Sequence, residues 1–315
     1  MTQRTQLRNE GAEVGSHTTV RRYRHPADYE MVDRFLIDAY EGGDRLLTWM
    51  QPRWEYMHAH PFIEGVPLDE IAVWEEDGRI VGVAHPEDKL TFVYFQRAPG
   101  YDHILPAMFD HAAECFGGPS VMLQREIIGL FINDFDTALE TEAARRGYVM
   151  LDGYHEGYSL FALDKPIPPA PVPGGFRIQS LEDDNNHRKI NLCLWRGFNH
   201  EGDQSEADAA RPGLAQGAPN FRKDLTIVAV APNGDYVSYA GMWHEEQNRF
   251  GYVEPVATDP DYRRMGLGRA IVLETLRRVR ADGATVAWVG SDQEFYGALG
   301  FEKKFQRNLW AKYLD

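Results

Sequence analysis

The sequence predicts two copies of one α/β fold in tandem, each with a mixed, mostly antiparallel sheet flanked by helices. Three observations lead to this prediction. The chain has 315 residues, which is about twice the ~150 residues of an average domain. A proline-rich segment stands near its middle, and short patterns before this segment recur after it at a nearly constant spacing. Internal repetition of this kind is typical of duplicated structural units.

The repeat rests on three features that occur in the same order in both halves. Each half begins with a short strand, then has a hairpin that turns at Asp-Gly or Asn-Gly, and later closes a helix with glycine and an aromatic residue. The matching positions are Arg21 and Arg177, Gly78 and Gly234, and Gly147 and Gly300, which stand 156, 156 and 153 positions apart.

The first copy is expected to begin with a strand at residues 20–23 and a helix through residues 29–36. Its hairpin covers residues 71–83, because alternating apolar residues flank an Asp-Gly pair. A late helix over residues 136–146 has an aspartate N-cap at its first position and a glycine directly after its last. The complete order is strand, helix, hairpin, strand, helix, strand, helix, strand.

The second copy repeats this order. A strand at residues 176–178 precedes a helix through residues 190–195, and the hairpin covers residues 227–237. A long helix is predicted over residues 267–281, because its apolar positions follow helical spacing and Gly283 ends it.

The segment over residues 165–175 contains five of the 18 prolines. Dense proline removes hydrogen-bond donors and favours an extended chain, so we expect a semi-rigid linker between two domains. The predicted organisation is a polar tail at 1–17, a first domain at 18–165, the linker at 166–175 and a second domain at 176–315.

The chain is acidic, with 33 Lys and Arg against 48 Asp and Glu and a formal net charge of −15. Binding to nucleic acid or to an anionic membrane requires a basic surface, so the charge argues against both partners. A cationic substrate is compatible with it, although a charge that simply keeps the protein soluble is the simpler explanation.

The two cysteines, Cys115 and Cys193, stand among apolar neighbours in different halves. They read as buried free thiols and are too few for a four-ligand zinc site, so no metal is expected. Residues 1–16 lack the apolar run of a secretory signal, and no segment is apolar enough to span a membrane. We therefore expect a cytoplasmic protein.

The segment over residues 252–270 is the most informative one for chemistry. A predicted strand ends near Thr258, and Arg-x-x-Gly-x-Gly at residues 263–268 opens the long helix. The first N–H groups of a helix have no internal acceptor, and glycines let a phosphate approach them. Nearby arginines add positive charge, so the loop suits a pyrophosphate; the alternative is a turn that glycines merely tighten. The segment lacks the Gly-Lys of a Walker A loop and, because Ile271 replaces a third glycine, the Rossmann pattern.

This strand, the Asp-Pro-Asp-Tyr at residues 259–262, the glycine loop and the helix resemble motif A of the GCN5-related N-acetyltransferases (GNAT). Phe-Tyr-Gly-Ala-Leu-Gly-Phe at residues 295–301 resembles a later motif of that family. The resemblance covers about residues 175–315 and implies that the backbone binds the pyrophosphate, pantetheine arm and thioester of acetyl-CoA. The implied binding residues are Val256, Ala257, Thr258, Arg263, Arg264, Met265, Gly266, Leu267, Gly268 and Arg269. An asparagine frequent in the family before the last helix is replaced here by Gly-Ser-Asp-Gln at residues 290–293.

The first copy is expected to be inactive. It has Arg97 and Gly100 in the corresponding loop but Asp102 in place of the second glycine, and a carboxylate there would repel pyrophosphate. Ala143 stands where the second copy has Tyr296. The first copy therefore reads as a degenerate GNAT-like domain that shapes a cleft or an interface.

The resemblance implies that Tyr296 protonates the leaving thiolate; the alternative is a tyrosine packed in the core. Glu254 is the candidate general base, because residues 252, 254, 256 and 258 of a regular strand share one face. It could instead be an ordinary surface glutamate, and Pro255 could disturb the alternation. His244 and the terminal carboxylate of Asp315 are the other candidate bases.

The acceptor is less well specified. The acidic loop over residues 199–208, with Glu201 and Asp203, could attract a polyamine or an aminoglycoside, or it could be an ordinary solvated loop. Trp49, Trp54 and Tyr56 could line a cleft or belong to a core.

The leading hypothesis is an N-acetyltransferase that transfers an acetyl group from acetyl-CoA to a primary amine of a small molecule. Direct attack in a ternary complex is expected, because no cysteine lies near the motif. The expected partners are a small-molecule amine but no nucleic acid and no membrane, with the protein a monomer or a homodimer. The alternatives are a non-catalytic acyl-CoA-binding sensor or scaffold, and aminoacyl transfer from charged tRNA, a chemistry also found on tandem copies of this fold.

Overall fold

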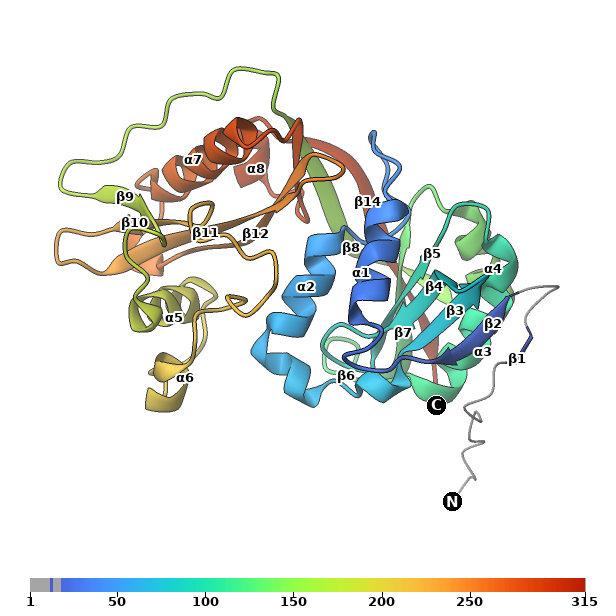
Figure 1. Ribbon diagram of the computed structural model, residues 1–315. Coiled ribbons are helices and arrows are strands. Elements are labelled where there is room, and N and C mark those ends of the chain that lie inside the picture. The colour runs from blue at the N-terminus through green and yellow to red at the C-terminus, as the bar shows by residue number, and fades with distance from the viewer. Residues whose placement is uncertain (1–11, 14–17, 315) are drawn as a thin grey trace. The chain divides into compact units, whose positions relative to one another are not determined.

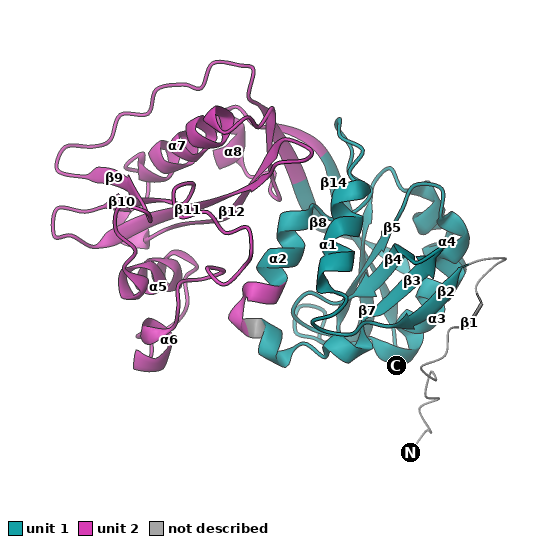
Figure 2. Cartoon of the chain, viewed as in Figure 1, with its two compact units in different colours: residues 1–57, 62–157, 305–315 teal, residues 58–61, 158–304 magenta. Residues whose placement is uncertain are grey.

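The structure, a computed structural model, describes residues 12, 13 and 18–314 (Figure 1). The chain divides into two compact units (Figure 2), called unit 1 and unit 2 below. Unit 1 comprises residues 1–57, 62–157 and 305–315, and unit 2 comprises residues 58–61 and 158–304. Each unit contains a mixed, mostly antiparallel sheet with a hydrophobic core on either face, which confirms the predicted fold class.

Unit 1 has the predicted order of elements, with one further helix after the first. All its strand pairs are antiparallel except β5 with β7, which run parallel. Its strands, in sheet order, are β1 (Ala12–Glu13), β2 (Thr19–Arg22), β3 (Ala72–Glu76), β4 (Arg79–His85), β5 (Phe92–Arg97), β7 (Arg125–Asn133), most of β14 (Glu302–Tyr313) and the first part of β8 (Val149–Ala162), and β6 (Gly118–Ser120) pairs with β7. Its helices are α1 (Tyr29–Asp38), α2 (Gln51–Ala59), α3 (Leu105–Cys115) and α4 (Thr137–Arg145).

Unit 2 repeats this arrangement, and here the parallel pair is β12 with β13. Its strands, in sheet order, are the end of β8 (Val149–Ala162), β13 (Val286–Val289), β12 (Phe250–Thr258), β11 (Tyr236–Glu245), β10 (Ile227–Val230) and β9 (Arg177–Ser180). Its helices are α5 (His187–Gly197), α6 (Glu206–Ala210), α7 (Leu267–Ala281) and α8 (Glu294–Leu299). Short 3₁₀ helices occupy Pro61–Gly65, Leu68–Glu70, Asp102–Ile104 and Pro260–Tyr262.

Local signals in the sequence located the turns and caps correctly. Asp77 and Gly78 have φ of 51° and 76°, as a tight hairpin turn requires. The Asp136 side chain accepts a hydrogen bond from the Leu139 amide and so caps α4. Helix α7 covers the predicted residues 267–281.

The two tryptophans that could have lined a cleft belong to a core of unit 1. Helices α1 and α2 cover one face of its sheet, where Trp49 and Trp54 are 2% and 0% exposed. Helices α3 and α4 cover the other face around Phe109 and Leu139. Burial of aromatic surface on this scale stabilises the fold, so we assign these two residues to packing.

The two copies exchange their last strands. Residues 159–162 of β8, at the end of the first copy, pair with β13 of unit 2. Residues 307–313 of β14, at the end of the second copy, pair with β7 of unit 1. The compact units therefore differ from the expected domains at 18–165 and 176–315, because strand pairing assigns the end of each copy to the other unit.

The proline-rich segment also differs from the expected spacer between domains. It connects β8 to β9 within unit 2, and Figure 1 shows it passing over α7. Ile167, Ala170 and Val172 pack against the unit 2 core, and the Arg277 side chain donates a hydrogen bond of 2.7 Å to the Pro168 carbonyl. The apolar residues of this segment remove hydrophobic surface from water by packing on the core. A free spacer between domains would make no such contact. Within residues 12, 13 and 18–314, none of the helices has the length and apolar character that a membrane span requires.

Candidate functional site

The candidate site lies where two parallel strands of unit 2 diverge. Strand β12 pairs with β13 only over residues 250–252, so the edge of β12 from residue 253 onward has no partner in β13. A pocket of about 680 Å³ opens beside this edge, between the end of α5, the loop into α7 and the start of α8. The predicted binding residues that line it are Val256, Ala257, Thr258, Arg263, Arg264, Gly266, Leu267, Gly268 and Arg269, together with Tyr296. Met265 does not line the pocket and is 41% exposed beside it.

The loop between β12 and α7 presents free amides to the pocket. Arg264 and Gly266 have φ of 63° and 84°, and Gly266 is the N-cap of α7. The first backbone bond of the helix runs from the Ala270 amide to the Gly266 carbonyl. The amides of residues 267–269 consequently have no acceptor within the helix, and they lie at the positive end of its dipole.

The free amides at the start of α7 form a cradle for an anion. A side chain at residue 268 would fill this cradle. A Cβ atom there would lie 3.2 Å from the Thr258 hydroxyl oxygen and 3.5 Å from the Phe295 ring. The backbone of α7 can therefore be approached closely only because residue 268 is glycine. Gly266 is required for a different reason, because its φ lies in the left-handed region.

The three arginines of the loop have different roles. Arg263 donates hydrogen bonds to the carbonyls of Thr258 and Gly197, at 3.0 Å and 2.8 Å. Arg269 donates to the Ala298 carbonyl at 3.1 Å. Arg264 is exposed and has no hydrogen bond or ion pair with any residue that the structure describes. Two of the guanidinium groups thus brace the walls of the pocket, and that of Arg264 is available to an anion.

The first aspartate of Asp-Pro-Asp-Tyr ties this loop to α5, which the sequence did not reveal. Asp259 is 6% exposed, and the Arg196 guanidinium donates to both of its carboxylate oxygens, in one case at 3.0 Å. Burial raises the pKa of Asp259, but the bonds from Arg196 outweigh burial and hold that pKa below its usual value. The ionised carboxylate fixes the entry to the glycine loop.

Tyr296 lies on α8 with its ring in the unit 2 core. It is 8% exposed and packs edge-on against Phe301, with ring centres 5.7 Å apart, yet it also lines the pocket. Burial raises the pKa of Tyr296 above its usual value, and the negative charge of Glu254 raises it further. The phenol therefore remains protonated at neutral pH. Gln293, in the segment that replaces the family's asparagine, precedes α8 and lines the pocket.

The prediction that Glu254 shares a face with Val256 and Thr258 is wrong. Ala240 pairs with Val256, but Met242 pairs with Val253, so β12 contains one residue more than β11 over this stretch. Such a β-bulge reverses the alternation of side chains beyond it. Val253 and Val256 consequently both contact the core on the α7 face, and Glu254 lies on the opposite face of the sheet, the one that α5 covers.

The bulge follows from the sequence at this point. Pro255 has no amide N–H and cannot donate a hydrogen bond to the neighbouring strand. The regular alternation of side chains between the two faces is lost at this residue. Glu254 is half-buried on its own face of the sheet.

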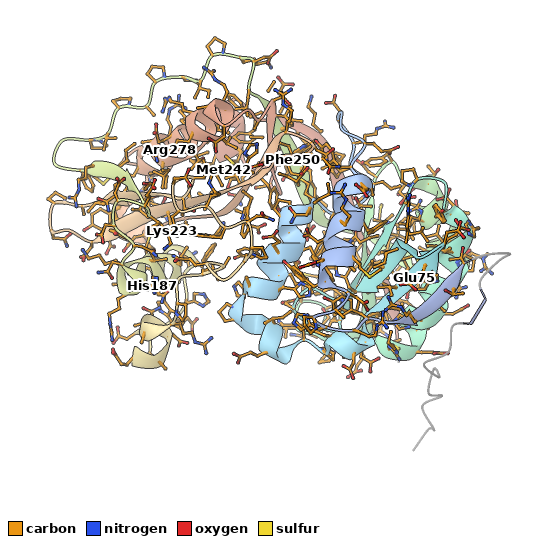
Figure 3. All side chains as sticks on the ribbon, in the orientation of Figure 1. Glu75, His187, Lys223, Met242, Phe250 and Arg278 are labelled. Carbon is orange, nitrogen blue, oxygen red and sulfur yellow. The ribbon has the colours of Figure 1, made fainter. Side chains whose placement is uncertain are left out.

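Glu254 does not line the pocket, and neither do the candidate base His244 and the candidate acceptor residues. His244 shares a face of β11 with Met242, whose side chain packs under α7 (Figure 3), so it lies on the opposite face from Glu254. Glu201 and Asp203 are exposed in a loop and do not line the pocket. Asp315 lies outside the described residues. Among the residues described, no group of three or more His, Cys, Asp or Glu side chains could hold a metal ion.

The corresponding opening in unit 1 is closed. Strand β5 pairs with β7 only over residues 92–93 and then diverges, but the space between them is about 10 Å³. Arg97, at the end of β5, donates two hydrogen bonds of 2.7 Å to Asp136, at the start of α4. Both side chains are buried, and Asp102 accepts a third bond from Arg97 at 2.7 Å. An internal ion pair thus bridges the gap that is open in unit 2.

A comparison with known protein families matches part of unit 2. Residues 189–301 match the model of the Acetyltransferase (GNAT) family, and this stretch contains the glycine loop and Tyr296. This part of the chain is therefore similar to the GNAT family. The family's chemistry is acetyl transfer, and the match lies in unit 2, where the pocket is open.

Solved structures show the same fold over nearly the whole chain. A GCN5-related N-acetyltransferase from Sphaerobacter thermophilus is 16% identical with a TM-score of 0.61, covering 96% of this chain and 97% of its own. A tandem GNAT protein from the clavulanic acid biosynthesis pathway is 14% identical with a TM-score of 0.59, covering 94% and 98%. FemX is 12% identical with a TM-score of 0.53, covering 91% and 96%. A comparison with curated proteins finds no match.

Proposed function

We propose that unit 2 transfers an acetyl group from acetyl-CoA to a primary amine of a small molecule, by direct attack in a ternary complex. The observation that carries this proposal is the contrast between two equivalent openings. The one in unit 2 leads to the N-terminus of α7 and to Tyr296, and the one in unit 1 is reduced to about 10 Å³ beside the bonded pair Arg97 and Asp136. The GNAT match supports acetyl transfer as the chemistry.

The residues of the pocket fit acetyl-CoA. A Cβ at Gly268 would occupy the cradle in front of the α7 amides, so the site is shaped for a group that approaches the backbone. The amides of residues 267–269 and the Arg264 guanidinium would hold the pyrophosphate. The unpaired edge of β12 at residues 256–258 would hold the pantetheine arm as an added strand does. When bound, acetyl-CoA supplies the acetyl thioester.

The reaction requires three proton and charge events, and the chain has a candidate group for each of them. The amine loses a proton to Glu254, directly or through water, and its nitrogen then attacks the thioester carbon. The carbon–sulfur bond breaks as the tetrahedral intermediate collapses. Tyr296 gives its proton to the departing thiolate. The raised pKa of Tyr296 keeps the phenol protonated until this step. Backbone amides at the β12 edge are the candidate donors to the oxyanion.

Direct attack is preferred to a covalent acetyl-enzyme because neither cysteine can serve as a nucleophile. Cys193 is 1% exposed in the unit 2 core, and burial raises the pKa of its thiol to about 12. Cys115 belongs to unit 1, and burial raises the pKa of its thiol to about 11. A thiolate at neutral pH is therefore rare at both positions.

The net charge of −15 favours a cationic amine as the acceptor. It also argues against charged tRNA, because a polyanion requires a basic surface. A polyamine or an aminoglycoside has the appropriate charge and a primary amine, so these two classes are the first acceptors to examine.

The test is free-thiol release from acetyl-CoA in the presence of a panel of primary amines, with mass spectrometry of the acetylated product. Release that depends on the amine supports the proposed function. Thermal stabilisation by acetyl-CoA without any release would instead identify an acyl-CoA-binding sensor or scaffold.

A further inference from the structure

The backbone carbonyl of Glu254 is held from two sides by β11. The indole N–H of Trp243 donates a hydrogen bond of 2.9 Å to this oxygen. A Cβ atom on Gly241 would lie only 2.4 Å from the same oxygen, so the carbonyl occupies space that exists because residue 241 is glycine. Trp243 supplies the hydrogen-bond donor, and Gly241 leaves the space that the carbonyl occupies.

This carbonyl lies at the bulge of β12. The register shifts between the pairs Ala240–Val256 and Met242–Val253, and Gly241 stands opposite the extra residue. A Cβ on Gly241 would also lie 3.2 Å from the Pro255 ring. Because the side-chain period of a strand is two, the position of the bulge decides which face of the sheet each neighbouring side chain occupies. It therefore decides where the carboxylate of Glu254 points.

Trp243 is suited to hold this carbonyl in place. Its ring is 3% exposed, and its edge lies against Phe221 with ring centres 6.0 Å apart. It stands opposite Tyr252, which is 2% exposed, so the indole has little freedom to turn. A hydrogen bond from a rigid, buried donor is costly to lose, because the acceptor is then left without its partner.

We propose that Trp243 and Gly241 are positioning residues for catalysis: they fix the bulge through the Glu254 carbonyl and thereby aim the Glu254 carboxylate at the acceptor amine. The proposal rests on the proposed function, in which Glu254 is the base. Neither residue touches the reacting atoms. They keep Glu254 on one face of the sheet while Val256–Thr258 remain available to the thioester on the other side of the bulge.

The decisive variant is Trp243→Phe, which keeps an aromatic ring and removes the indole donor. We expect kcat to fall about tenfold, as the loss of one buried hydrogen bond implies. The Kd for acetyl-CoA, measured by calorimetry, should stay within about twofold, because the glycine loop is unaffected. The acid limb of the kcat/KM profile should also move, since the surroundings of the Glu254 carboxylate change.

Trp74→Phe is the matched control. Trp74 is fully buried in unit 1, and its indole nitrogen donates to none of the residues that the structure describes. Gly241→Ala displaces the same carbonyl without removing the donor, and it should give the same split between kcat and Kd as Trp243→Phe.

The outcomes distinguish the positioning role from the proposed acetyltransferase function on which it rests. A wild-type chain without turnover would overturn both. A wild-type chain with turnover, together with Trp243→Phe and Gly241→Ala variants that keep the kcat and pH profile of Trp74→Phe, would overturn only the positioning role. A fall in kcat matched by an equal loss of acetyl-CoA affinity would also overturn it, because it would indicate general damage to unit 2.

Discussion

Replacing Gly268 with aspartate is expected to abolish acetyl-CoA binding while leaving the fold intact. The new Cβ would lie 3.2 Å from the Thr258 hydroxyl oxygen and 3.5 Å from the Phe295 ring, within the cradle in front of α7. Its carboxylate would therefore occupy the space proposed for the pyrophosphate. An acidic residue in the first turn of a helix is favourable to the helix itself, so the variant should fold.

The magnitude follows from the charge. Two like charges about 4 Å apart repel by about 4 kcal/mol at an effective dielectric constant of about 20. Since each 1.4 kcal/mol corresponds to a factor of ten, Kd should rise about a thousandfold. Isothermal titration calorimetry with acetyl-CoA measures this change, and circular dichroism with thermal unfolding verifies the fold.

Gly297→Asp is the matched control for the added charge. Gly297 lies on α8, and a Cβ there would meet nothing within 4 Å. This variant adds the same charge to the same unit outside the pocket lining, so its Kd should stay close to the wild-type value. The reasoning is refuted if Gly268→Asp binds acetyl-CoA with a Kd within tenfold of the wild type.

Three further substitutions and one control substitution test the remaining groups. Tyr296→Phe should lower kcat by about 10²- to 10⁴-fold with little change in the Kd for acetyl-CoA; because the pKa of Tyr296 is raised, the wild-type kcat should not decline through loss of the phenol proton below about pH 10. An unchanged kcat in this variant would remove Tyr296 from the mechanism. Glu254→Gln should lower kcat/KM and flatten its acid limb, and retention of that limb would point to another base. Asp136→Ala should destabilise unit 1 by about 3–5 kcal/mol, because it leaves Arg97 buried without its main partner; Asp102→Asn, at a 58% exposed side chain, should cost less than about 1 kcal/mol in the same urea titration, and equal effects would contradict the role of Asp136.

Features encoded within a few residues were predictable. The turn at Asp77-Gly78, the cap at Asp136 and the bounds of α7 each depend on short-range hydrogen bonds and backbone preferences. The glycine loop belongs to the same class, because free amides at a helix N-terminus follow from the strand–loop–helix order alone.

Features that depend on distant residues were missed. The exchange of β8 and β14 joins strands that are far apart in the sequence, and an exchanged strand has the same pattern as one that stays with its own copy. The Arg97–Asp136 ion pair spans 39 positions. Asp102 was expected to exclude phosphate by its charge. The structure shows that Asp102 and Asp136 both bind Arg97. The opening in unit 1 is therefore closed by packed side chains as well as by charge.

The bulge at Glu254 is an intermediate case. Pro255 signalled that the alternation could fail, but the direction of the shift depends on Gly241 in the neighbouring strand. A one-residue change of register reverses the facing of every later side chain, so a strand prediction can be right in its bounds and wrong in its faces.

The central claim is that the chain has one acyl-CoA site, in unit 2, and that the equivalent opening in unit 1 is closed by its own side chains. Calorimetric titration of the wild-type chain with acetyl-CoA tests this claim most directly through the stoichiometry. We predict one acetyl-CoA bound per chain. Two per chain would show that the Arg97–Asp136 pair does not close unit 1, and none would contradict the assignment of the pocket beside β12.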